Sequence, residues 1–103
     1  MRTVLDRYRV AFNTLDARAA AAVWPSVDAK ALGRAFERLQ EQEVSFVNCQ
    51  VAVTDTHADA SCGGNSRYVP KVGNKNPRDE AREWTFGLEK IGAEWRIRSV
   101  TMR

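Results

Sequence analysis

The spacing of apolar residues changes once along this chain, near Glu43. Before that point apolar side chains recur every three or four positions, which is typical of amphipathic helices; after it they alternate with polar ones, which is typical of strands with one buried face. The chain has 103 residues, of which 44% are hydrophobic and 28% charged, so it has room for one core. We therefore predict a single α+β domain over residues 1–103, with its helices first and its sheet second.

Three helices are expected, over residues 2–14, 17–24 and 28–41. Asp16 stands where an N-capping oxygen is needed for the second helix, and Ser26 and Asp28 offer capping oxygens for the third. Pro25 prevents the second helix from continuing. The connection from Pro25 to Asp28 is short, so the second and third helices should follow each other directly.

Four antiparallel strands are expected after the helices. A hairpin with Asp55 and Thr56 at its turn pairs residues 47–54 with 57–64 and sets Cys49 opposite Cys62. Residues 65–80 should begin as a continuation of the strand and then become a long connection. A second hairpin pairs residues 83–89 with 95–102, with Leu88 opposite Ile97, Glu89 opposite Arg96 and Phe86 opposite Ser99.

This register predicts that the sheet face toward the helices carries no titratable side chain apart from the cysteine thiols. The expected inward positions are Val47, Cys49, Val51, Val53, Ala58, Ala60, Cys62, Trp84, Phe86, Leu88, Ile97, Ser99 and Thr101. A slip of one residue in the first hairpin would instead turn Asn48, Gln50, His57 and Asp59 inward.

The order of elements, with YRVAFNTLDARAAAAVWPS at residues 8–26 and WTFGLEKIGAEWRIRSV at residues 84–100, resembles the nuclear transport factor 2-like superfamily. That resemblance implies an α+β cone roll: three N-terminal helices packed on a curved four-stranded antiparallel sheet, with a pocket between them. Leu-Asp followed by Val-Trp-Pro-Ser, the two cysteines and Tyr-Val-Pro-Lys-Val look, more narrowly, like domains appended to bacterial multidomain proteins such as Ser/Thr kinases. The chain departs from the superfamily pattern in having no room for a small hairpin between its second and third helices.

The side chains expected to line the pocket are Tyr8, Phe12, Trp24, Phe36, Val51, Trp84 and Phe86. Enzymes of the superfamily place ionisable groups on inward strand faces, and none is expected here, so we predict no catalytic residue. The favoured function is a non-catalytic accessory domain that binds a small apolar ligand or a protein partner. The alternative is a small-molecule isomerase, cyclase or dehydratase, which needs an acid or base; Asp6 and Asp16 are better explained as exposed or capping, and His57 should point outward.

Cys49 and Cys62 admit two interpretations, a cross-strand disulfide or two buried thiols. One histidine and two cysteines match no zinc site, and no cofactor is indicated.

An exposed Trp95, with Tyr68 and Met102 near a sheet face, is a candidate protein interface. The expected partners are a second copy of the chain, bound through the sheet, or other domains of a parent protein. The net charge of +3 is spread along the chain and includes a basic loop from Lys71 to Arg82, but no nucleic-acid-binding motif is present. We expect no membrane insertion. The compartment stays open: cytoplasmic for a free-standing chain, extracytoplasmic for a fragment of a membrane-anchored protein.

Overall fold

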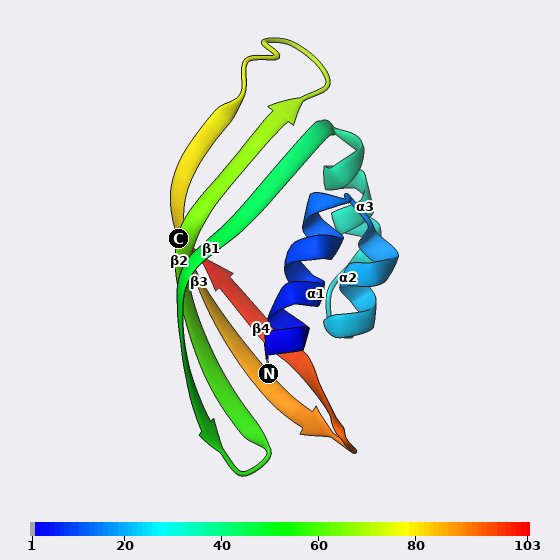
Figure 1. The fold of residues 1–103 in the computed structure, drawn as a ribbon. Coiled ribbons are helices and arrows are strands. Elements are labelled where there is room, and N and C mark those ends of the chain that lie inside the picture. Colours follow the sequence, from blue (N-terminus) through cyan, green and yellow to red (C-terminus); the bar gives the residue numbers. More distant parts are fainter. Residues whose placement is uncertain (1) are drawn as a thin grey trace.

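Three helices lie against one face of a long, curved antiparallel sheet in the computed structural model, which describes residues 2–103 (Figure 1). The helices are α1 (Arg2–Asn13), α2 (Ala17–Val23) and α3 (Ala29–Glu37), and the strands are β1 (Leu39–Thr54), β2 (His57–Pro70), β3 (Arg78–Ile91) and β4 (Glu94–Met102). The strands follow chain order, β1-β2-β3-β4. This is the predicted fold class. We call the sheet face toward the helices the inner face and the opposite one the outer face.

Short capping interactions set the beginnings of α2 and α3. The Oδ1 atom of Asp16 accepts a hydrogen bond from the backbone N–H of Ala19 at 3.0 Å, and that of Asp28 accepts one from Ala31 at 3.0 Å. Each cap satisfies a backbone donor that has no partner inside its helix. The predicted cap at Asp16 is confirmed, and of the two oxygens offered for α3 Asp28 is the cap, whereas the Ser26 hydroxyl donates to the carbonyl of Arg98.

The sheet is longer than the sequence pattern indicated, and two predictions about its extent were wrong. Residues 39–41 were assigned to the third helix, but α3 ends at Glu37 and Leu39 pairs with Pro70. Residues 65–80 were expected to form mainly a connection, but β2 continues to Pro70 and β3 already begins at Arg78, which leaves 71–77 as the loop. The end of α3 and the extents of β2 and β3 are set by pairing between residues that lie far apart in the sequence. The local spacing of apolar residues does not reveal that pairing.

A β-bulge in the middle of β1 bends the sheet. Phe46 pairs with Gly64 and Asn48 with Gly63, so Val47 is the additional residue. A Cβ atom on Gly64 would lie 1.9 Å from the carbonyl oxygen of Ser45, so only glycine allows the two strands to approach this closely. Val47 was predicted to face inward, but the bulge leaves its side chain 81% exposed.

A second bulge in β4 changes which of its residues face the helices. Gly87 pairs with Ser99 and Leu88 with Ile97, so Arg98 is the additional residue. The predicted pairing of Leu88 with Ile97 is confirmed, as are those of Cys49 with Cys62 and Glu89 with Arg96. Phe86 pairs with Val100, not with Ser99 as predicted. The inward assignments of Ser99 and Thr101 were therefore wrong: both are exposed, whereas Val100 packs against the core.

Candidate functional site

Helix α1 is held beside β1 by side chains that bond to the backbone. The carboxamide of Asn13 accepts a hydrogen bond from the N–H of Val44 at 2.6 Å and donates one to the carbonyl of Val44 at 3.3 Å. The side chain of Gln42 donates to the carbonyl of Phe12 at 3.1 Å. The bonds of Asn13 satisfy backbone groups on the free edge of β1, and the bond of Gln42 satisfies a carbonyl in the last turn of α1. Together they fix the distance between the helix and β1.

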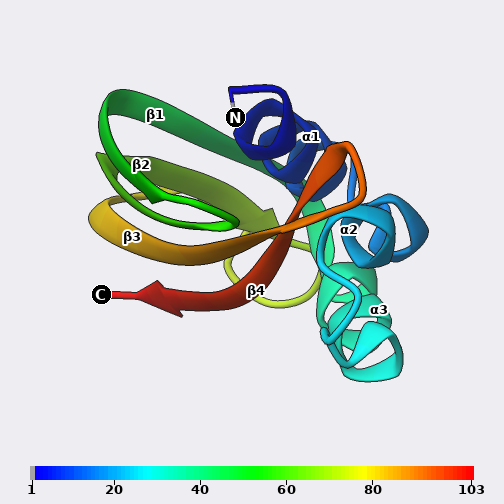
Figure 2. The ribbon, with the colours of Figure 1, turned by 90° about the horizontal axis from the view of Figure 1, so that it is seen from below.

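An apolar groove runs between α1 and the part of β1 that follows the bulge. It has a volume of about 480 Å³ and is lined by Leu5, Asp6, Arg9, Phe46, Val47, Asn48, Cys49, Val51 and Val53; we call it the α1–β1 groove. Val51 and Val53 are 41% and 56% exposed. Apolar side chains this accessible inside a concave surface are typical of ligand sites. Figure 2 shows that α1 lies over the beginning of β1, while the rest of that strand curves away from the helices.

The wall of the α1–β1 groove includes one half of a disulfide bond. Cys49 and Cys62 are bonded, with their Cα atoms 4.1 Å apart. Cys49 lines the groove, and Cys62 is buried in the core at 2% exposure. Of the two interpretations that the sequence left open, the structure contains the bridge. It links β1 to β2 directly after the bulge.

Most of the side chains expected to line a pocket form the core of the protein. Tyr8, Trp84 and Phe86 are buried, and the rings of Tyr8 and Phe86 meet edge to face at 5.0 Å. Phe12 stacks on Tyr8 at 4.3 Å. Burial raises the pKa of the Tyr8 hydroxyl well above its ordinary value, because the charged phenolate would lose its hydration. The remaining three predicted lining residues divide between core and groove: Trp24 packs on the core, Phe36 is buried against Phe12, and Val51 lines the α1–β1 groove.

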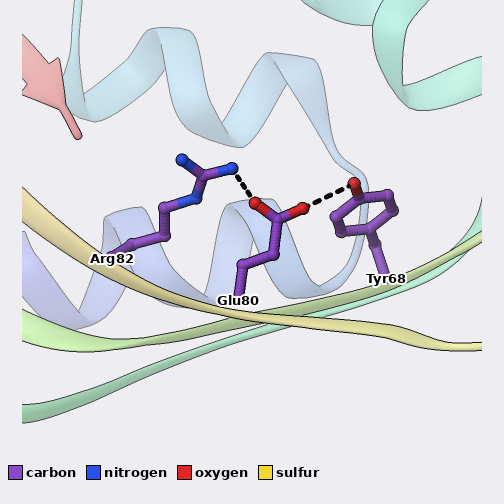
Figure 3. Close-up of polar contacts among 3 residues, drawn as sticks. All are labelled: Tyr68, Glu80 and Arg82. Carbon is purple, nitrogen blue, oxygen red and sulfur yellow. Dashed lines mark hydrogen bonds and ion pairs between the residues drawn. The ribbon is translucent and has the colours of Figure 1, made fainter.

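A polar cluster of Tyr68, Glu80 and Arg82 occupies the inner face of the sheet near the loop at 71–77 (Figure 3). The Tyr68 hydroxyl donates a hydrogen bond to one carboxylate oxygen of Glu80 at 2.9 Å, and Arg82 forms an ion pair with the other. All three side chains are half-buried. Figure 3 shows them rising from the side of the sheet on which the helices lie.

This cluster contradicts the prediction that the inner face carries no titratable side chain apart from the cysteines. Trp84 and Phe86 face inward, so the alternation along β3 also places Glu80 and Arg82 inward. The signal was present in the sequence as polar residues two and four positions before Trp84. The alternation from residue 83 onward predicts a strand that excludes Glu80 and Arg82. Only the pairing of β3 with β2 shows that β3 begins at Arg78.

The three residues proposed as an interface lie far apart. Along β3, Tyr68 pairs with Arg78, Met102 with Trp84, and Trp95 with Lys90. Successive partners are six residues apart, which corresponds to about 20 Å of strand. The expectation that Trp95 lies outside the core was wrong, because it is half-buried and packs against the core.

His57 lies where the strand register predicted, and Asp6 and Asp16 are exposed or capping, as expected from their helical positions. His57 is exposed beside the β1–β2 turn, with its Nδ1 atom 3.4 Å from the Thr56 hydroxyl. Asp16 caps α2, and Asp6 is exposed at the rim of the α1–β1 groove.

Within residues 2–103, no three His, Cys, Asp or Glu side chains gather in a way that would hold a metal ion. None of the helices described there is long and apolar enough to cross a membrane.

The fold is shared with solved structures of the nuclear transport factor 2-like superfamily. A candidate dehydratase of the NTF2-like family from Streptomyces avermitilis superposes with a TM-score of 0.83 at 11% identity, covering 98% of this chain and 91% of that one. An NTF2-like superfamily protein from Salmonella enterica superposes with a TM-score of 0.87 at 12% identity, covering 98% and 85%. A LinA-type hexachlorocyclohexane dehydrochlorinase from Novosphingobium barchaimii gives 0.83 at 11% identity, covering 99% and 82%.

No family model matches the sequence, and no curated protein matches it. At these low identities the structural likenesses establish the NTF2-like fold of the chain and leave its activity open. The narrower resemblance to domains of bacterial Ser/Thr kinases stays a prediction.

Proposed function

We propose that this chain is a non-catalytic binding domain that takes a small apolar ligand in the α1–β1 groove. The observation that carries the proposal is the row of accessible valines, Val47, Val51 and Val53, in a concave surface beside Leu5. Its volume of about 480 Å³ falls within the roughly 300–1,000 Å³ range of small-molecule sites.

Burial of the valines is the expected source of affinity. Covering a fully exposed valine yields about 1.5–3 kcal/mol, and Val51 and Val53 retain roughly half of their accessible surface. Each should therefore contribute about 1 kcal/mol to binding an apolar molecule, less the cost of ordering that molecule. The disulfide and the bonds from Asn13 hold both walls of the groove in place before the ligand arrives.

The test is fluorescence titration with N-phenyl-1-naphthylamine, a neutral apolar probe. Replacing Val51 and Val53 with serine should weaken binding about tenfold or more, because two apolar contacts are lost. Val72→Ser is the matched control, since Val72 is 86% exposed in the loop at 71–77. Equal affinities for the wild type and the Val51→Ser/Val53→Ser variant would exclude the groove as the site.

A second candidate function, proton transfer in a small-molecule isomerase, cyclase or dehydratase, is favoured by the Glu80 carboxylate on the inner face. General-base catalysis needs a positioned proton acceptor, which a carboxylate can be, and Tyr68 and Arg82 position this one. The relatives named as a candidate dehydratase and a dehydrochlorinase support the same class of reaction. Both oxygens of Glu80 are engaged, so a substrate would have to displace one partner.

Catalysis can be tested with a panel of β-hydroxy ketones, whose dehydration produces a conjugated enone that absorbs in the ultraviolet. Any activity should be abolished in Glu80→Gln and retained in Glu83→Gln, because Glu83 lies exposed on the outer face. Turnover that survives Glu80→Gln would remove Glu80 from the mechanism.

We further propose that two copies associate through the outer face of the sheet. Its centre carries short polar side chains: Thr85 pairs with Ser61 on one side and Thr101 on the other, and all three are exposed. Short side chains let the sheet of a second copy approach this face closely. Sedimentation velocity should show a dimer that Thr85→Arg dissociates; a wild-type monomer at high concentration would refute the proposal.

A further inference from the structure

Arg9 stands between the α1–β1 groove and a second, more polar hollow. That hollow has a volume of about 500 Å³ and is lined by Arg9, Asn13, Gln42, Glu43, Val44, Ser45 and Phe46. Arg9 and Phe46 line both spaces, so Arg9 stands at the border between an apolar surface and a polar one.

The guanidinium of Arg9 forms no ion pair within residues 2–103, although its residue is half-buried. The two ion pairs described there belong to Arg82 and Arg96. An arginine held partly out of water without a carboxylate partner retains most of its capacity to bind an anion.

Arg9 is the one cationic side chain among the described residues that line the groove and the hollow. The carboxamides of Asn13 and Gln42 are already bonded to the backbone. Asp6 lies at the rim of the groove and Glu43 at the rim of the hollow, and both are exposed. Water and salt screen the charges of these two carboxylates more strongly than the charge of the half-buried guanidinium. The electrostatic potential at a ligand head beside Arg9 is therefore set mainly by the positive charge.

We infer that the ligand of the α1–β1 groove is a single-chain amphiphile whose carboxylate head binds Arg9 and whose apolar chain lies along Val47, Val51 and Val53. The inference rests on the proposed function and adds the ligand class to it. A carboxylate matches the planar guanidinium with two parallel hydrogen bonds. The bulge positions the apolar chain, because it turns Val47 out beside the path to Val51.

The experiment compares three twelve-carbon molecules that differ only in their heads: dodecanoate, dodecanol and dodecylammonium. Dodecanoate and dodecylammonium are used below their micelle concentrations, and dodecanol below its solubility limit, to displace N-phenyl-1-naphthylamine from the groove. Dodecanoate should bind about ten- to a hundredfold more tightly than dodecanol, which corresponds to the roughly 1.5–3 kcal/mol of a charge-assisted hydrogen bond. Dodecylammonium should bind more weakly than dodecanoate.

Variants of Arg9 assign the preference to this residue. Arg9→Gln should reduce the affinity for dodecanoate to that for dodecanol and leave dodecanol binding unchanged. Arg9→Lys keeps the charge but not the fork of donors, so part of the preference should remain. Arg18→Gln, on the exposed surface of α2, is the matched control and should behave as the wild type.

Equal binding of the acid and the alcohol, or a preference that survives Arg9→Gln, would overturn the inference and leave the apolar groove intact. Failure of every molecule, including the neutral probe, to bind would instead refute the proposed function, and the inference with it.

Discussion

The disulfide between Cys49 and Cys62 should contribute a large part of the stability of this domain. The two cysteines are separated by 13 residues. In the chain-entropy model, closing a loop of that size removes roughly 10 cal/mol/K of entropy from the unfolded chain, which stabilises the folded state by about 3 kcal/mol at 25 °C. A small domain is typically stable by only about 5–15 kcal/mol, so reduction should lower its stability substantially.

The same free energy can be expressed as a change in melting temperature. Unfolding entropy near the midpoint is about 2.1 cal/mol/K per residue, or about 0.2 kcal/mol/K for 103 residues. Reduction should therefore lower the Tm by about 14 °C. The measurement is thermal and urea denaturation followed by circular dichroism, with and without a phosphine reductant.

The double variant Cys49→Ala/Cys62→Ala is the control for effects of the reductant itself. It should melt near the reduced wild type and show no response to reductant, apart from the small cost of the side-chain volume removed from the buried Cys62. A reduced wild type whose Tm stays within about 2 °C of the oxidised one would refute the loop-entropy reasoning. Two reactive thiols in the unfolded, unreduced protein would refute the bridge.

Three further predictions concern the features that shape the groove and the core. Gly64→Ala should destabilise the fold by about 1–3 kcal/mol or more, because the new Cβ atom meets the backbone of β1, whereas Gly63→Ala, with open space around its Cβ position, should change urea stability little. Asn13→Ala should cost about 1–3 kcal/mol through the two lost hydrogen bonds to Val44, and faster amide hydrogen exchange at Val44 should accompany it; unchanged exchange would argue against this anchor. The raised pKa of Tyr8 means that the unfolded chain releases its phenol proton first as the pH rises through the ordinary value of 10.0, so the stability that is present below that pH is lost above it. Denaturation of the wild type and Tyr8→Phe at pH 8 and pH 11 should show a smaller alkaline loss in the variant, and parallel losses would contradict the assignment.

The sequence alone determined the class and order of the elements, because both follow from local patterns. A spacing of three to four residues before Glu43 and alternation after it are properties of neighbouring residues, as are the caps at Asp16 and Asp28. The two hairpin registers around Cys49 and Leu88 also follow locally, since short turns bring adjacent strands together.

Tertiary structure decided which side chains form a site. The bulge at Val47 depends on the absence of a side chain at Gly64, seventeen positions further along the chain, and no pattern within β1 reveals it. The start of β3 at Arg78 depends on pairing with β2, and only that pairing brings Glu80 to Tyr68. The α1–β1 groove likewise exists because Asn13 reaches the backbone of β1. Local periodicity carries the direction of a side chain along its own strand or helix, but not the contacts between elements that determine whether that side chain is buried in the core or lines a groove.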